Sequence, residues 1–196
     1  AAALLLDADA MLRFDSLRAP EAALRRWFNA AALVRSAAQG GVVVTTASPS
    51  PVEQALVRWD PTWFALYELD ERSQIGLPPA VRTAAITGTE DDVQAFLAEL
   101  NLPEGVRVTG PVPLDEDFFA HQSVHAGVES GGEGDISEPS PSGAEDAVPG
   151  DWRAILFFTY AQAPQVTHEL RSVRAALSAL RRVGAVQVRC DGLDVV

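Results

Sequence analysis

Short apolar runs alternate along the chain with segments in which apolar residues recur at helical spacing. Continuous apolar runs at residues 1–6 and 42–44 predict buried parallel strands. Four more strands are predicted at residues 81–87, 106–109, 154–160 and 186–190. Helical spacing predicts helices at residues 20–34, 52–59, 61–74, 90–100 and 165–183. The alternation predicts an α/β fold.

The second half of the chain has the clearer pattern. From residue 81 the predicted order is β-α-β, a long loop, then β-α-β, which is typical of a split βαβ (ferredoxin-like) domain. In helix 165–183 the apolar residues are spaced 4, 3, 4 and 3: Val166, Leu170, Val173, Leu177 and Leu180. The Gly-Leu-Pro-Pro sequence at residues 76–79 breaks the chain, so we expect one domain at residues 1–75 and another at 76–196.

Charge is distributed unevenly along the 196 residues. All 15 basic residues are Arg, and 27 acidic residues bring the formal net charge to −12. Ten of the acidic residues fall within 115–151, a Gly-, Ser- and Pro-rich stretch with little apolar content. Such a composition predicts a disordered acidic insertion. Outside it the chain is nearly neutral, so the low overall charge does not exclude an anionic partner for the folded part.

The composition also bears on cellular setting. There is one cysteine, Cys190, which excludes a disulfide framework and a zinc site built from cysteines within these residues. No apolar run approaches the roughly 20 residues that span a bilayer. The chain lacks an initiator Met and opens on the apolar run at 1–6, so we expect a piece of a longer protein. A cytoplasmic protein without a membrane partner is predicted.

Two aspartates at the end of the first predicted strand suggest one kind of enzyme. Asp7 and Asp9 form an Asp-x-Asp sequence that is similar to the nucleophile motif of haloacid-dehalogenase-like phosphatases, in which carboxylates work around magnesium. The chain has no Lys for the usual charge-neutralising role, and Met11 stands where that family has Thr. The alternative is that both aspartates simply follow a strand.

Other chemistry-bearing residues give weaker signals. His121 and His125 have the spacing of a helical metal pair but no obvious third ligand, and His168 stands alone. Trp63 and Tyr67 are four residues apart and favour packing between domains over base stacking. We find no Ser-His-Asp or Cys-His constellation and no Gly-rich phosphate loop, so no catalytic residue, metal site or bound cofactor is predicted for these residues.

Arginines line one flank of the last predicted helix. At 100° per residue, four of them fall roughly 60–160° from the centre of the apolar side: Arg171, Arg174, Arg181 and Arg182. An Arg side chain stays charged, and its planar fork bonds phosphate in a bidentate way. This arginine stripe is therefore a candidate DNA-binding site, with an ordinary solvated face as the alternative.

Several sequence segments resemble the PriA (primosomal protein N′) family in their order and spacing. Residues 4–12, 17–21 and 52–60 resemble the end of that family's second helicase lobe. Residues 68–72 with 76–82 resemble its junction into the C-terminal domain, and Val108 to Pro113 its Gly-Pro turn. Val186 to Arg189, followed by Asp191 and Leu193-Asp194, resembles its closing strand. The resemblance is closest to the actinobacterial form.

The resemblance implies a fold and a function. It implies that residues 1–75 are the remnant of a RecA-like helicase lobe and that 76–196 form the family's C-terminal domain. Members restart stalled replication forks, bind branched or single-stranded DNA, act with other primosome and replication proteins, and use ATP, magnesium and zinc. The regions for ATP and zinc lie upstream of the matched segments.

One departure from the family pattern concerns unwinding. The family's last helicase motif reads Gly-Arg-x-Gly-Arg, whereas the matching residues here are Ala31-Ala32-Leu33-Val34-Arg35, which keep only the final arginine. An arginine finger is worth roughly 10³–10⁵ in rate. We therefore expect a DNA-binding part of a PriA-like protein without helicase activity. A phosphatase using Asp7 and Asp9, or a protein-interaction module using the acidic insertion, remain alternatives.

Overall fold

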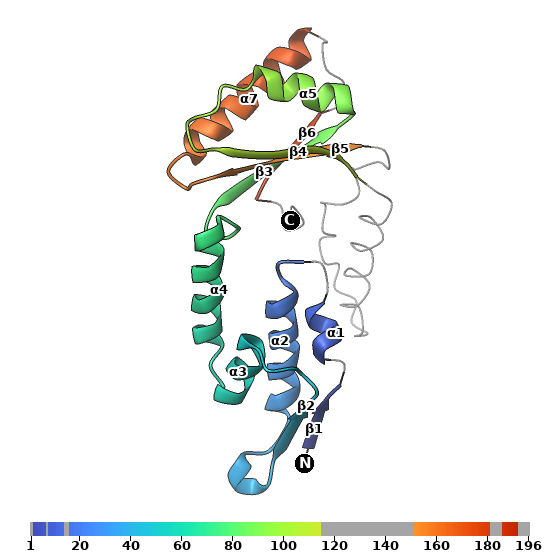
Figure 1. The fold of residues 1–196 in the computed structure, drawn as a ribbon, viewed down its shortest axis with the longest axis vertical. Helices are drawn as coiled ribbons and strands as arrows, with labels where there is room; N and C mark the ends of the chain where they lie inside the picture. Colours follow the sequence, from blue (N-terminus) through green and yellow to red (C-terminus); the bar gives the residue numbers. More distant parts are fainter. Residues whose placement is uncertain (1, 7, 14–15, 115–150, 181–185, 192–196) are drawn as a thin grey trace, which may run out of the picture. The chain divides into compact units, whose positions relative to one another are not determined.

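The computed structural model describes residues 2–6, 8–13, 16–114, 151–180 and 186–191 (Figure 1). These residues form a mixed α/β structure, which confirms the predicted class. The chain divides into two compact units, one of residues 1–74 and one that begins at residue 75. The predicted acidic insertion lies almost wholly outside the described residues, as do Asp7, His121, His125, Arg181 and Arg182.

The N-terminal unit is a two-stranded parallel sheet with helices. Its elements are β1 (Ala2–Leu5), α1 (Ala8–Leu12), α2 (Ala19–Ala32), the 3-10 turn η1 (Ala37–Gln39), β2 (Val42–Thr45), α3 (Pro51–Arg58) and α4 (Pro61–Ile75). Strand β1 pairs with β2 in parallel, with Ala2 opposite Val42. The unit's core centres on Trp27 and Phe64, packed with Leu24, Val52 and Leu56. The helix α1 is not predicted by the sequence pattern, because five residues give too little periodicity.

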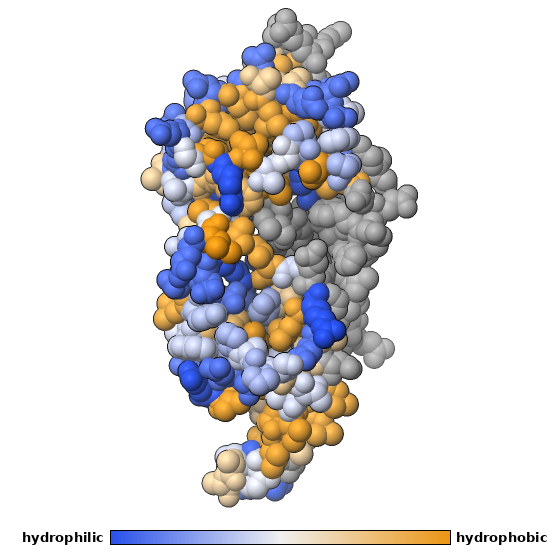
Figure 2. Space-filling view, in the orientation of Figure 1, coloured by the Kyte–Doolittle hydropathy of each residue, from blue (hydrophilic) through white to orange (hydrophobic). Residues whose placement is uncertain are grey.

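The parallel pairing of the first two strands is confirmed, but their predicted burial is wrong. Leu4 is 65% exposed and Val44 is 49% exposed. A parallel strand is buried when both faces of its sheet are covered. Of the side chains in β1, that of Leu5 is the buried one, and it packs into the core around Trp27. Figure 2 shows the resulting hydrophobic surface over this pair of strands.

Side-chain caps start three of the helices. Ser50 accepts a hydrogen bond from the Glu53 N–H at 3.2 Å at the start of α3. Asp60 accepts one from the Trp63 N–H at 2.8 Å at the start of α4. The C-terminal unit's α5 starts in the same way, with Thr89 accepting from the Asp92 N–H at 3.3 Å. Each cap satisfies a backbone donor that the first helical turn leaves without a partner.

A buried ion pair holds the helices of the N-terminal unit together. The Arg72 side chain is 9% exposed, and its guanidinium lies 2.9 Å from the Glu68 carboxylate and 3.0 Å from that of Glu21. It also donates to the Leu17 carbonyl at 2.6 Å. Arg72 thus connects α4 to α2 and to the residues that precede α2.

The C-terminal unit is a four-stranded antiparallel sheet with two helices on one face (Figure 1). Its elements are β3 (Arg82–Gly88), α5 (Glu90–Glu99), β4 (Arg107–Pro113), β5 (Trp152–Phe158), α7 (Ala163–Leu180) and β6 (Gln187–Cys190). The strand order is β4-β5-β3-β6, and every neighbouring pair is antiparallel. Each β-α-β unit therefore has a strand of the other unit between its own two strands.

The core of this unit lies between the sheet and its two helices. The sheet contributes Ala84, Ile86, Ala154, Leu156 and Phe158, which alternate with residues of the opposite face. Helix α5 contributes Val93 and Phe96. Helix α7 contributes Val166, Leu170, Val173 and Leu177, so the predicted apolar spacing is confirmed for these four.

Strand β4 runs further than the sequence predicts. The sequence pattern predicts a strand at residues 106–109, yet pairing with β5 resumes at Val112, after an irregularity. Gly110 has a φ of 92°, and a Cβ there would lie 2.6 Å from the Arg153 carbonyl oxygen. Because β4 is an edge strand, a proline and a bulge interrupt it without breaking the sheet.

We predict that deleting residues 122–149 leaves the thermal unfolding midpoint unchanged or slightly higher. The Leu114 N–H donates to the Asp151 carbonyl at 2.7 Å, so the chain leaves β4 and enters β5 at adjacent points. Shortening a connection between fixed ends reduces the entropy cost of closing it, by about 0.6 kcal/mol for each halving. Calorimetry of the two forms measures this. A fall of several degrees would show that the insertion supports the fold.

We predict that Arg72→Ala lowers the free energy of unfolding of the N-terminal unit by about 2–3 kcal/mol. The change leaves the half-buried Glu68 carboxylate and the Leu17 carbonyl without this donor. The matched control is Arg18→Ala, which changes an exposed arginine and should shift stability by under about 0.5 kcal/mol. Denaturant unfolding measures the free energy of unfolding of both variants. Equal losses in the two variants would show that Arg72 does not stabilise the unit more than an exposed arginine does.

Candidate nucleic-acid interface

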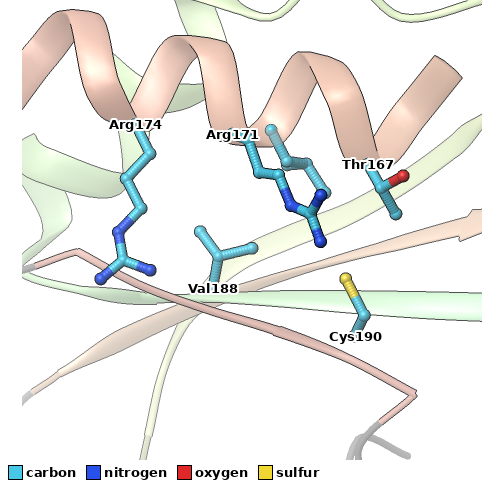
Figure 3. A pocket seen from close by; sticks show the side chains of 6 residues that line it. Thr167, Arg171, Arg174, Val188 and Cys190 are labelled. Atoms are coloured by element: carbon cyan, nitrogen blue, oxygen red, sulfur yellow. The ribbon is translucent and has the colours of Figure 1, made fainter. Parts of the chain in front are cut away.

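Helix α7 places two arginines beside the edge of the sheet. Burial of Val166, Leu170 and Val173 fixes the helix rotation, so that Arg171 and Arg174 emerge on one flank, three residues apart. Both side chains are exposed and extend from α7 toward β6 (Figure 3). The structure thus brings together two members of the predicted stripe. Arg181 and Arg182 lie outside the described residues.

A shallow cavity lies between the two arginines and strand β6. Its volume is about 190 Å³, and it is lined by Thr167, Leu170, Arg171, Arg174, Val188 and Cys190 (Figure 3). Val188 and Cys190 line it together because alternate residues of a strand face the same side. The cavity has an apolar base and a basic rim, and the sequence alone does not reveal it.

The carboxylates nearest these arginines in sequence are engaged elsewhere. Glu169 accepts a hydrogen bond from the Asn101 N–H at 2.9 Å. Asp191 accepts from the Arg82 Nε–H at 2.8 Å and from the Thr83 N–H at 3.2 Å. Within the described part of the chain, neither Arg171 nor Arg174 forms an ion pair. Among the described residues, the charges of these two arginines are therefore not paired with a carboxylate.

The thiol in this cavity is not activated. Burial raises the pKa of Cys190, the Asp191 carboxylate raises it further, and the charges of Arg82 and Arg171 oppose these effects without cancelling them. Cys190 is consequently a neutral thiol near pH 7, whereas nucleophilic cysteines have lowered pKa values. The sulfur is partly desolvated while the residue as a whole is exposed, so the thiol remains accessible to reagents.

The ion pair of Asp191 with Arg82 ties the end of β6 to the start of β3. Burial raises the pKa of the Asp191 carboxyl, but the hydrogen bonds from Arg82 and Thr83 and the Arg82 charge outweigh this effect, so the pKa is lowered overall. A lowered pKa in the folded protein means stability that is present above the unfolded value of about 3.9 and is lost as the pH falls through the folded value.

The opposite face of the sheet carries a second group of arginines. The Arg107 guanidinium lies 4.3 Å from the centre of the Phe157 ring, and it donates to the Gly76 carbonyl at 3.0 Å. Arg153 and Arg189 share this face by strand register and are engaged in interactions of their own. The sequence-based prediction missed this group, although the alternation of strand residues with the core positions signals it.

The remaining sequence candidates within the described residues, Asp9 and His168, lie on separate helices. Asp9 lies on α1 and accepts hydrogen bonds from the Ser48 N–H and hydroxyl at 2.8 and 2.7 Å, which lower its pKa. It therefore connects α1 to the loop before α3. His168 is exposed on α7. No cluster of three or more potential metal ligands occurs among the residues the structure describes.

The aromatic residues of α4 form a stack on its surface. The Trp63 and Tyr67 rings lie 5.7 Å apart, and the Arg58 guanidinium lies 5.0 Å from the Trp63 ring centre. Trp59 packs edge-on against Phe28 at 4.7 Å while 56% of its surface stays exposed. The predicted packing of these residues between domains stays a prediction.

Residues 31–35, which the resemblance matches to the family's last helicase motif, span the end of α2. Ala31 and Ala32 are the last two residues of α2, and residues 33–35 follow this helix and precede β2. Ala31 is buried and Arg35 is exposed. Gly41, just before β2, is required, because a Cβ there would lie 1.7 Å from the Arg35 carbonyl oxygen.

Comparison with known proteins identifies the family. A family model described as the primosomal protein N C-terminal domain matches residues 73–193, more than half of the chain. The chain therefore belongs to this family of PriA C-terminal domains. It is 49% identical over 116 residues to a probable replication restart protein PriA of Mycobacterium leprae, an alignment that covers 59% of this chain and 18% of that protein. It is 48% identical over 118 residues to the protein of the same name in Mycobacterium tuberculosis, covering 58% and 18%.

The chain spans less than a fifth of the length of these relatives. The predicted membership of the PriA family is confirmed. Among the described helices, none has both the length and the apolar content needed to span a bilayer.

We predict that Asp191→Asn flattens the acid dependence of stability. In the unchanged chain the denaturant midpoint should fall as the pH is lowered below about 4, because protonation of Asp191 removes its charge interaction with Arg82. The variant should be less stable at pH 7 and lose less on acidification. Urea titrations between pH 7 and 3 give both values. The same pH dependence in both proteins would assign the acid sensitivity to other carboxylates.

Proposed function

We propose that this chain is the DNA-binding C-terminal part of a replication restart protein of the PriA type. The observation that carries the proposal is the pair Arg171 and Arg174, exposed on α7 and free of ion pairs within the described residues. Membership of the family supports it, as does the name of the mycobacterial relatives. In this proposal, branched or single-stranded DNA lies along the stripe, and other primosome proteins act on the same substrate.

The form of the two units supports a more detailed assignment. The strand order of the C-terminal unit, with each β-α-β unit enclosing a strand of the other, is the order expected for a split βαβ, ferredoxin-like domain. The parallel pair β1 and β2, joined through helices α1 and α2, is consistent with the end of a RecA-like helicase lobe. We therefore propose that residues 1–75 derive from the second lobe.

Phosphate contact is the mode of binding that the chemistry of the stripe favours. Arginine remains charged at any physiological pH and bonds a phosphate with two parallel donors. Contacts of this kind position a protein on DNA without reading its sequence. We therefore infer binding that is strongly dependent on salt and tolerant of sequence.

The degenerate residues 31–35 support the absence of unwinding. Only Arg35 matches the family's Gly-Arg-x-Gly-Arg motif, and the position of its first arginine is held by Ala32. A missing arginine finger is sufficient to lower nucleotide hydrolysis by roughly 10³-fold or more. We propose that a full-length protein with this segment binds forks without separating their strands.

We predict that Arg171→Ala with Arg174→Ala reduces the salt dependence of DNA binding. Removing each phosphate-binding guanidinium should reduce the slope of log Kd against log salt by about 1, because fewer counterions are released. Fluorescence anisotropy with a labelled fork and a labelled single strand, at several salt concentrations, measures the slope. The affinities for the fork and for the single strand should fall by a similar factor.

Two variants control this experiment. Arg18→Ala removes an exposed arginine of the N-terminal unit, and Arg107→Ala removes one from the opposite sheet face. Arg72 is unsuitable as a control, since its loss affects the fold. If the salt slope is unchanged in the double variant but reduced in Arg107→Ala, the DNA-binding interface lies on the opposite face of the sheet. No binding by the unchanged chain would favour the protein-interaction alternative.

A further inference from the structure

The cavity under the arginine stripe differs from a simple phosphate-binding surface. Its base is made of Leu170 and Val188 with the neutral thiol of Cys190, and its rim is made of the two guanidinium groups. Two exposed arginines on a solvated helix are sufficient for phosphate contact. They do not require an apolar hollow beneath them, so the hollow calls for a ligand with an apolar part as well as an anionic part.

The dimensions of the hollow suit one aromatic ring. A protein cavity of about 150 Å³ lined by apolar side chains accommodates a benzene molecule. The volume of about 190 Å³ here is therefore adequate for a single six-membered ring and tight for a fused pair of rings. The Thr167 hydroxyl on its wall donates to the Ala163 carbonyl at 2.7 Å, so it does not offer its proton to a ligand.

Two residues that line the hollow, Val188 and Cys190, turn backbone groups away from β3. The Asp191 N–H donates to the Thr83 carbonyl at 2.9 Å, so Asp191 and Thr83 form a hydrogen-bonded pair of the antiparallel ladder. Such pairs alternate along a ladder, which turns the N–H and C=O groups of Val188 and Cys190 away from β3. Strand β6 is the edge of the sheet among the described residues, so these groups face outward beside the hollow.

We propose that the hollow between α7 and β6 takes one unstacked pyrimidine base of a single strand while Arg171 and Arg174 hold its phosphates. A base is the part of DNA that combines a flat apolar surface with an edge of donors and acceptors, and its phosphates are attached within reach of the same rim. This inference rests on the proposed DNA binding and specifies which part of the DNA the site accepts. The site should therefore bind single-stranded DNA more tightly than duplex DNA, because a paired base cannot enter the hollow.

The one cysteine of the chain provides a direct readout. A maleimide reagent labels only Cys190, which lines the hollow. A saturating oligothymidine of twelve residues should slow this labelling about fivefold. An abasic twelve-residue strand, which retains the phosphates but has no bases, should slow it less than about twofold at equal occupancy. Equal shielding by the two strands would overturn the proposal.

Filling the hollow gives a second, independent test. Val188→Phe should weaken oligothymidine binding about fivefold and leave binding of the abasic strand unchanged, since the base can no longer be buried in the hollow. Val188→Ala, which enlarges the hollow, is the matched control and should retain oligothymidine binding within about twofold. Circular dichroism checks that both variants fold. If Val188→Phe does not fold, the labelling of Cys190 in the unchanged chain still decides the question.

Failure of this inference and failure of the proposed function give different results. If the strands bind with a salt slope that depends on Arg171 and Arg174, yet Cys190 is shielded equally by the abasic strand, the phosphate interface stands and the base site is wrong. If neither strand binds, both are wrong. If an acidic peptide such as polyglutamate shields Cys190 as well as oligothymidine does, the site recognises anionic charge and the base plays no part.

Discussion

The burial of one apolar stripe of α7 against the sheet determines the surface of the C-terminal unit. Four apolar side chains of α7 are buried: Val166, Leu170, Val173 and Leu177. Burial of each such side chain stabilises the fold by roughly 1.5–3 kcal/mol, which leaves the helix little freedom to rotate about its axis. The positions of Arg171 and Arg174 are consequences of that constraint. Because the buried apolar side chains fix the rotation of α7, the two arginines extend from its flank toward β6 (Figure 3).

The same constraint explains why the arginines remain available. A helix surface usually balances its charges with acidic residues one turn away. Here Glu169 is directed to the Asn101 N–H, and Asp191 is directed to Arg82 and the Thr83 N–H. Both carboxylates stabilise the connection of elements within the fold. The carboxylates closest in sequence thus serve the structure, and within the described residues the two arginines form no ion pair.

The sequence predicts the local features of this structure well and the long-range ones poorly. The 4, 3, 4 spacing of α7 depends on residues within a turn or two of each other, and it is confirmed. The cavity depends on β6 pairing with β3, which is about 100 residues away, so its members cannot be connected by spacing. The continuation of β4 past Gly110 was missed because a Gly-Pro pair indicates a break unless the strand is known to be at an edge. The arginines Arg107, Arg153 and Arg189 were missed because they come from three separate strands.

The central claim is that DNA phosphates contact the α7 flank rather than the opposite face of the sheet. Nuclear magnetic resonance of the arginine Nε–Hε groups during titration with a single-stranded oligonucleotide tests it most directly, because each guanidinium reports on its own surroundings. Our account predicts that the signals of Arg171 and Arg174 shift and saturate together with DNA, whereas that of Arg107 stays in place. Shifts confined to Arg107, Arg153 and Arg189 would contradict it.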